Sequence, residues 1–146
     1  MRAGLGGTLN PHLRLGGEGF FWQHGLSADK APIIVTGTVL LVYYPRLRGG
    51  PVLEGGVGLS NWALGKGTGD PFESISADTT YNSGTGWGYT LSIGWEVNPG
   101  DGGALVPRLT YAYGNQGTLH APDGATVATG WKSNLLLLTV GYRGWK

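Results

Sequence analysis

Residues 87–97 restrict the fold of this chain more than any other segment, because large and small side chains alternate along them without a break. Every odd position is large and apolar, from Trp87 to Val97, whereas every even position is Gly, Thr, Ser or Glu. A period of two is that of a β-strand with one apolar and one polar face. The row from Trp87 to Trp95 spans roughly 25 Å at about 3.3 Å per residue. Aromatic ends around an aliphatic centre are typical of a strand in a transmembrane β-barrel.

The same alternation recurs more weakly in six other segments, which are separated by residues that favour turns. The seven predicted strands are residues 2–9, 12–23, 33–44, 52–62, 87–97, 104–114 and 131–145. Connections after the first, third and fifth strands are short, and 24–31, 65–84 and 115–130 are predicted to be longer polar loops. The pattern predicts an all-β chain that folds as an antiparallel up-and-down transmembrane β-barrel, with short turns at one end.

Length and composition agree with one β-barrel domain over residues 1–146. The 10 Lys and Arg nearly balance the 9 Asp and Glu, so no basic field predicts a nucleic-acid partner. The chain has no Cys, which excludes disulfides and thiolate metal sites. The 29 Gly follow no triplet period, and many alternate with apolar residues, as expected where a narrow interior is crowded. No apolar run approaches the roughly 18 residues of a membrane-spanning helix.

Strand direction predicts that the barrel is one strand short. The first and seventh predicted strands run the same way, so direct pairing between them would be parallel. Bacterial single-chain barrels have an even number of antiparallel strands, and open edges are costly in lipid. We therefore expect an eighth strand, either upstream of Met1 or supplied by a neighbouring chain.

The polar face of the predicted strands carries charges of both signs. We expect these charges in the barrel lumen: Arg2, Arg14, Glu18, Glu54, Glu96, Arg108 and Arg143. They should pair with one another, because an unpaired buried charge is too costly. A structural plug is the favoured role, since eight strands leave an interior that side chains just fill. An ion or proton path along the same charges is the alternative.

The opposite face carries aromatic side chains near strand ends. Residues predicted to mark the membrane interfaces are Phe21, Tyr43, Trp87, Tyr89, Trp95, Tyr111, Tyr113 and Tyr142. Aromatic girdles of this kind flank the lipid-facing band of transmembrane barrels. A soluble, lipocalin-like barrel that binds a small hydrophobic ligand would invert the same alternation, with aromatic rows inside and charges outside. Aromatic placement at strand ends and the many glycines opposite favour the membrane.

Nearly the whole chain resembles the small eight-stranded outer-membrane β-barrel proteins of Gram-negative-type bacteria. The matching segments are residues 6–11 leading into 13–18, then 43–46, 55–60, 85–89 and 128–134. The resemblance implies a bacterial outer-membrane location, with the lipid bilayer and the outer-membrane assembly machinery as partners. It implies a structural role in which the loops 65–84 and 115–130 are presented outside. The chain departs from the family pattern in lacking its first strand.

Histidines and serines offer a further alternative, because some small outer-membrane barrels act on lipid A with His and Ser. His24 and His120 are predicted in loops on the same side as Ser27 and Ser74. No spacing supports a catalytic triad, which geometry rather than sequence position defines. No pair among His12, His24 and His120 has convincing metal-ligand spacing either. We predict no catalytic, cofactor-binding or metal-binding residues, and no enzymatic activity.

Overall fold

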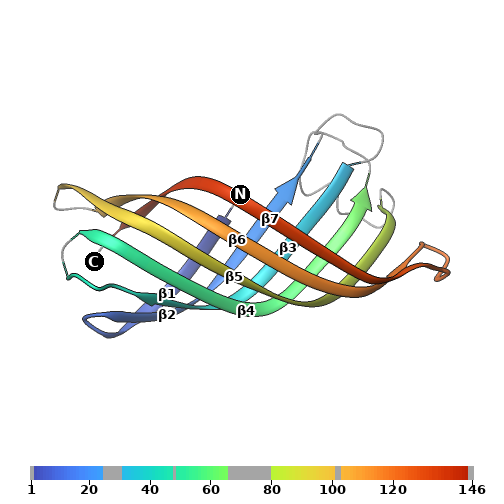
Figure 1. The fold of residues 1–146 in the computed structure, drawn as a ribbon, viewed down its shortest axis with the longest axis horizontal. Coiled ribbons are helices and arrows are strands. Elements are labelled where there is room, and N and C mark those ends of the chain that lie inside the picture. The colour runs from blue at the N-terminus through green and yellow to red at the C-terminus, as the bar shows by residue number, and fades with distance from the viewer. Residues whose placement is uncertain (1, 25–30, 48, 66–79, 101–102, 145–146) are drawn as a thin grey trace.

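The chain forms one antiparallel sheet in a computed structural model (Figure 1). The structure describes residues 2–24, 31–47, 49–65, 80–100 and 103–144. Its strands are β1 (Arg2–Asn10), β2 (Leu13–Gln23), β3 (Ala31–Tyr43), β4 (Gly50–Gly65), β5 (Thr80–Gly100), β6 (Gly103–His120) and β7 (Thr126–Gly144). Each strand pairs antiparallel with the next in sequence, in the order β1 to β7. The predicted all-β, up-and-down topology with seven strands is confirmed.

The sheet is coiled but does not close into a barrel. In Figure 1, β1, β2 and β3 cross behind β5, β6 and β7, so the sheet wraps around a concave face. Within the described residues β1 and β7 are the two sheet edges and do not pair with each other. An open seam therefore separates the first strand from the last.

The two faces of the sheet differ sharply in polarity. The concave face carries the even-numbered residues of β1 to β5 and of β6 as far as Gln116, and the odd-numbered residues of β7. Thr38, Glu54 and Thr110 are buried there. The convex face exposes large apolar side chains, and Leu138 of β7 is 82% exposed. This arrangement follows directly from the two-residue period of the strands.

The predicted loop 115–130 is wrong, because most of it belongs to a long hairpin. β6 continues to His120 and β7 begins at Thr126. Gly117 has a φ of 67°, a left-handed conformation, and the β6–β7 register shifts on both sides of it. Such a bulge adds a residue without ending the pairing. Beyond it the alternation is reset, and the odd-numbered Leu119 is buried.

The predicted loop 65–84 is too long at its C-terminal end. Thr80 to Gly84 belong to β5, where Asn82 pairs with Leu64 of β4. Residues 66–79 lie outside the described residues, as do 25–30 of the predicted loop 24–31. Ala31, placed in that loop by the sequence, begins β3. Polar and glycine-rich composition led to both errors, because paired strands beyond the apolar band do not need apolar side chains.

Tight coiling crowds the concave face, and Gly58 of β4 shows how closely the backbones approach there. A Cβ added to Gly58 would overlap the backbone carbonyl oxygen of Gly37 in β3. A Cβ added to Gly37 itself, on the convex face, would meet nothing within 4 Å. Inward-facing glycines therefore permit the curvature, as in other tight sheets where backbones approach closely.

This difference gives a matched pair of variants. We expect Gly58→Ala to lower the free energy of unfolding by about 1–3 kcal/mol, the usual cost of overpacking. Gly37→Ala should change it by no more than about 0.5 kcal/mol, as for other unconstrained surface positions. Equilibrium urea unfolding followed by Trp fluorescence measures both values. Equal losses in the two variants would contradict crowding of the concave face.

Candidate functional site

Four charged side chains from four strands converge on the concave face. Nε of Arg2 in β1 pairs with Oε2 of Glu18 in β2. Nη2 of the same Arg2 lies 2.9 Å from Oε2 of Glu54 in β4, and Nη1 of Arg108 in β6 lies 2.8 Å from that same oxygen. Two positive and two negative groups thus form a balanced cluster, which we call the Arg2–Glu54 cluster.

Two hydroxyl groups complete this cluster. Nη1 of Arg2 donates to Oγ1 of Thr110 at 3.0 Å and to Oγ of Ser92 at 3.4 Å. The Ser92 and Thr110 hydroxyl oxygens lie 2.8 Å apart. The Glu54 side chain is only 2% exposed. Interactions between charges strengthen when water is excluded, but losing one partner then leaves a buried charge behind.

Strand register explains how residues so distant in sequence meet. Glu54 of β4 lies opposite Ser92 of β5, which lies opposite Thr110 of β6, so the three form one row. Arg2 belongs to β1, at the far edge of the sheet, and reaches this row across the concave side. The side chain of one residue therefore spans from β1 to β6, which is possible only because the sheet is strongly coiled.

Three other predicted lumen charges are not part of this cluster. The guanidinium carbon of Arg14 lies 4.7 Å from the ring centroid of Tyr44, a cation–π geometry. Glu96 is buried on β5, opposite Gly50 of β4. Arg143 belongs to β7, but its side chain lies outside the described residues. The structure thus brings together Arg2, Glu18, Glu54 and Arg108 out of the seven predicted residues.

A second polar cluster, centred on Gln116, was missed because the sequence placed this residue in a loop. Nε2 of Gln116 donates to Oγ of Ser60 at 3.0 Å and to Oγ of Ser133 at 2.9 Å. The hydroxyl of Thr36 lies 3.2 Å from that of Ser60. The even-numbered inward positions of β6 continue through Gly114 to Gln116, so extending the alternation would have found this residue.

Indole rings contact each other across the concave side near this second cluster. The ring centroids of Trp62 in β4 and Trp131 in β7 lie 4.9 Å apart, with the planes tilted by 52°. Neither residue was among the predicted functional aromatics. Together with Gln116, this pair fills space between strands that are not hydrogen-bonded neighbours.

Four of the eight predicted interface aromatics form one cluster on the convex face. Tyr89 is central, with its ring centroid 5.1 Å from Tyr113, 6.1 Å from Tyr111 and 6.3 Å from Trp87. The hydroxyl of Tyr111 donates to Oδ1 of Asn134 at 2.6 Å. The cluster combines a large apolar surface with polar groups at its rim, as aromatic side chains at interfaces often do.

The other four predicted aromatics are not part of that cluster. Trp95 and Tyr142 are exposed near the C-terminal ends of β5 and β7, away from the cluster. Tyr43, at the end of β3, has its ring centroid 6.5 Å from that of His12. Phe21 lies on β2, where it pairs in register with Val35 of β3. The structure therefore distributes the eight residues over β2, β3, β5, β6 and β7.

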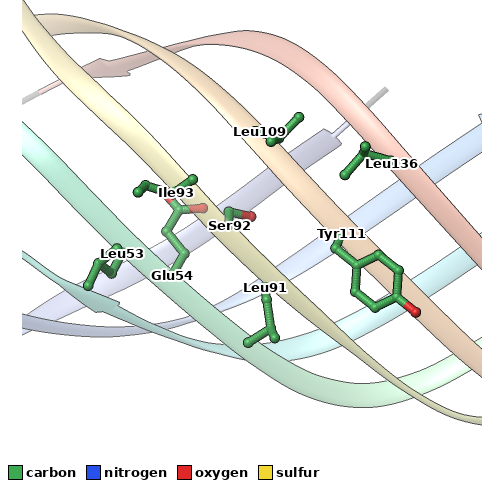
Figure 2. Close-up of a pocket in the computed structure, with 8 residues that line it drawn as sticks. All are labelled: Leu53, Glu54, Leu91, Ser92, Ile93, Leu109, Tyr111 and Leu136. Carbon is green, nitrogen blue, oxygen red and sulfur yellow. The ribbon is translucent and has the colours of Figure 1, made fainter.

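An open groove of about 370 Å³ runs along the convex face beside the aromatic cluster. Figure 2 shows the lining side chains, which come from β4, β5, β6 and β7. The outward members are apolar or aromatic: Leu53, Leu91, Ile93, Leu109, Tyr111 and Leu136. Glu54 and Ser92 contribute from the concave side. The groove therefore offers mainly apolar contact area on the convex face.

Histidines show no catalytic arrangement among the described residues. Nδ1 of His12 lies 2.7 Å from the carbonyl oxygen of Tyr44, and Nδ1 of His120 lies 3.4 Å from that of Gly124. The ring of His24 stacks on Trp22. Ser27 and Ser74 lie outside the described residues.

The described part of the chain contains no group of three or more His, Asp or Glu placed to hold a metal ion. It also contains no helix that is long and apolar enough to span a membrane. No protein-family model, curated protein or solved structure matches the chain. Its two faces and their contacts are therefore the evidence for its function.

Arg2 is the residue whose loss should most disturb the concave face. We expect Arg2→Met to lower the free energy of unfolding by about 3 kcal/mol, because Glu18 and Glu54 then lose a buried partner. The double variant Arg2→Met, Glu18→Gln should recover part of this loss, since one of the two stranded charges is removed. Urea unfolding of the single and double variants measures the coupling. Additive losses would show that the Arg2–Glu18 pair contributes nothing.

Proposed function

We propose that this chain is the membrane-embedded part of a bacterial outer-membrane protein, with a structural role that presents its connections at the surface. The observation that carries the proposal is the polarity of the two faces. Charged and hydroxyl side chains pair on the concave face, whereas the convex face is covered by exposed aliphatic and aromatic side chains. A contiguous apolar patch of this extent is rare on a protein surface in water.

The positions of the aliphatic and aromatic side chains on the convex face also support lipid contact. Its aliphatic band includes Leu91, Ile93, Leu109, Leu136 and Leu138, all exposed. The aromatic cluster lies along the same strands, where tyrosine hydroxyls can meet lipid headgroups. The outward side chains that line the groove of Figure 2 are apolar or aromatic, as contact with an acyl chain would require.

Backbone pairing is compatible with this proposal within the sheet, but not at its two edges. Nothing in a bilayer core can hydrogen-bond to free backbone groups, so only helices and paired, closed sheets are stable there. The six ladders that join successive strands from β1 to β7 pair the backbone inside the sheet, whereas the outer edges of β1 and β7 have no ladder partner among the described residues. Stability in lipid therefore requires that these two edges be covered. The long β6–β7 hairpin extends past the neighbouring strands in Figure 1 and would carry its connection away from the lipid.

The soluble, ligand-binding barrel is less well supported by these contacts. A barrel of that type needs an apolar interior around its ligand. The concave face instead contains three salt-bridge contacts and the Gln116 hydrogen bonds. Within the described residues, the contiguous cluster of buried apolar side chains is small: Leu40, Val42, Tyr44 and Val52. The paired charges also favour a structural plug over an ion path. Each charged side chain would have to break its salt bridge before an ion could pass.

Detergent refolding tests the proposal directly. A membrane sheet of this kind should migrate differently on a gel before and after boiling, and brominated lipid should quench its tryptophan fluorescence. Trp87 and Trp95 are more than half exposed on the convex face and should be quenched most. A monodisperse monomer in plain buffer, with tryptophans that brominated lipid does not reach, would refute the proposal.

A charge on the convex face gives a sharper test. Leu138→Arg should reduce the free energy of folding into lipid vesicles by about 2–4 kcal/mol, the cost of Arg near the bilayer midplane. Val127→Arg, at an exposed position of the β6–β7 hairpin, should cost no more than about 1 kcal/mol. Urea titration in vesicles measures both. If the convex face is in water, Leu138→Arg will be neutral, because the side chain it replaces is already exposed.

A further inference from the structure

We propose that Lys132 of β7 and the groove on the convex face form a binding site for one anionic phospholipid, with its phosphate at Lys132 and an acyl chain along the groove. This inference rests on the proposed membrane role, and it names the class of lipid that the convex face prefers. The site combines an exposed cation, hydrogen-bond donors near it and an apolar lining, which match the phosphate and the chains of such a lipid.

Lys132 is the only Lys, Arg, Asp or Glu on the convex face of the described strands. Its side chain is exposed, and the three salt bridges within the described residues all lie on the concave face and do not involve it. A cation without a carboxylate partner attracts an anion from its surroundings, most strongly where water is partly excluded. The convex face of these strands therefore carries its positive charge at one position.

Strand register places polar side chains next to Lys132. Asn115 of β6 lies directly opposite it, and Trp87 of β5 lies opposite Asn115. Asn134 is the next residue on the same face of β7, and its Oδ1 accepts a hydrogen bond from the Tyr111 hydroxyl at 2.6 Å. The Nδ2 group of Asn134 remains as a donor. Lysine is a common phosphate ligand, and an amide group can donate a further hydrogen bond to a phosphate oxygen.

Lys132 lies where the apolar band of the convex face ends. Farther toward the end of β4 and the start of β5, the convex face is polar, and Nδ2 of Asn61 donates to Oγ1 of Thr85 at 2.7 Å. In the other direction, Leu136 and Leu138 continue the same face of β7 and are exposed. A headgroup at Lys132 would therefore lie at the polar boundary, with its acyl chains against aliphatic side chains.

The groove lies within reach of an acyl chain whose headgroup is at Lys132. Its lining includes Tyr111 and Leu136, which lie opposite each other on β6 and β7 (Figure 2). Leu136 follows Lys132 on the same face of β7 at a distance of roughly 13 Å, at about 3.3 Å per residue. Half of the hydrocarbon core of a bilayer is about 15 Å thick. A chain that extends through one leaflet from Lys132 therefore passes the groove.

The charge at this position favours a headgroup with a single negative charge. A zwitterionic phospholipid brings an ammonium group, for which the convex face of the described strands offers no carboxylate. A lipid with two phosphates would leave one of them without a cation there. A phospholipid with one phosphodiester and a neutral alcohol, such as phosphatidylglycerol, matches both the single cation and the apolar groove.

Native mass spectrometry of the detergent-refolded chain measures this preference. The chain is mixed with equal amounts of dimyristoylphosphatidylglycerol and dimyristoylphosphatidylcholine, and the complexes with one bound lipid are compared. We expect the phosphatidylglycerol complex to be about fivefold more abundant, as for one basic residue at an anionic lipid surface. Lys132→Gln should abolish the preference, and Lys132→Arg should keep it. Higher ionic strength should weaken the preference in the unaltered chain, because salt screens an exposed charge.

Two pairs of variants separate the site from general effects of charge and apolar area. Arg46→Gln removes a positive charge from the β3–β4 connection, at the other end of the sheet, and should leave the preference unchanged. Leu136→Ala should weaken the binding of both lipids about fivefold without changing their ratio, because it removes apolar contact in the groove and no charge. Leu47→Ala changes an exposed position outside the groove and should weaken neither.

Three results would overturn the lipid site. The first is equal binding of the two lipids by the unaltered chain. The second is a preference for phosphatidylglycerol that persists in Lys132→Gln. The third is displacement of phosphatidylglycerol by glycerol phosphate at equal concentration, which would show that the groove contributes nothing.

Brominated lipids separate this proposal from the membrane proposal. Quenching of tryptophan fluorescence by brominated phosphatidylcholine and phosphatidylglycerol alike, without a preference in the mass spectra, would refute the lipid site and leave the membrane role intact. If neither brominated lipid quenches the tryptophans, the membrane role is refuted, and the lipid site with it.

Discussion

The ion pairs Arg2–Glu54 and Arg108–Glu54 hold together strands that share no backbone hydrogen bonds, and Glu18 of β2 adds a third pair with Arg2. A ladder joins only neighbours, so backbone pairing alone leaves the curvature of a long sheet undetermined. On the concave side, Arg2 joins the first strand to β4 and β6. The length of its side chain therefore limits how far β1 can lie from these two strands. Removing water from the cluster strengthens these contacts, and the balance of charge makes their burial tolerable.

The other features of the concave face follow from this coil. Close approach of β3 and β4 requires glycine at position 58. Gly141 and Gly114 leave the space that the long side chains of Arg108 and Gln116 occupy. On the convex face the same curvature spreads the outward side chains apart and exposes them. A sheet with charged side chains on its concave face and apolar side chains on its convex face is suited to lipid. The proposed function rests on this distribution.

Much of the fold was predictable from the sequence, because strand alternation is a local property. Residues 87–97 predicted both the strand and the face that each side chain occupies, and weaker copies of the pattern predicted the other six strands. Prediction failed at 115–130, where Gly117 permits a bulge and polar residues continue a paired hairpin. Composition indicated a loop there, so Gln116 and its partners were missed. The alternation along each strand could place the predicted charges on one face, but it could not select which of them contact one another.

The sequence by itself determined which side of each strand is polar, because a period of two needs no knowledge of the neighbouring strands. It also determined that the first and last strands run in parallel directions. Only the tertiary structure decided that Arg2 meets Glu54 and Thr110, residues more than fifty positions away. It also decided that the described strands do not close into a barrel. Both depend on how far seven twisted strands coil, and that is set by side-chain contacts across the sheet, which no local pattern records.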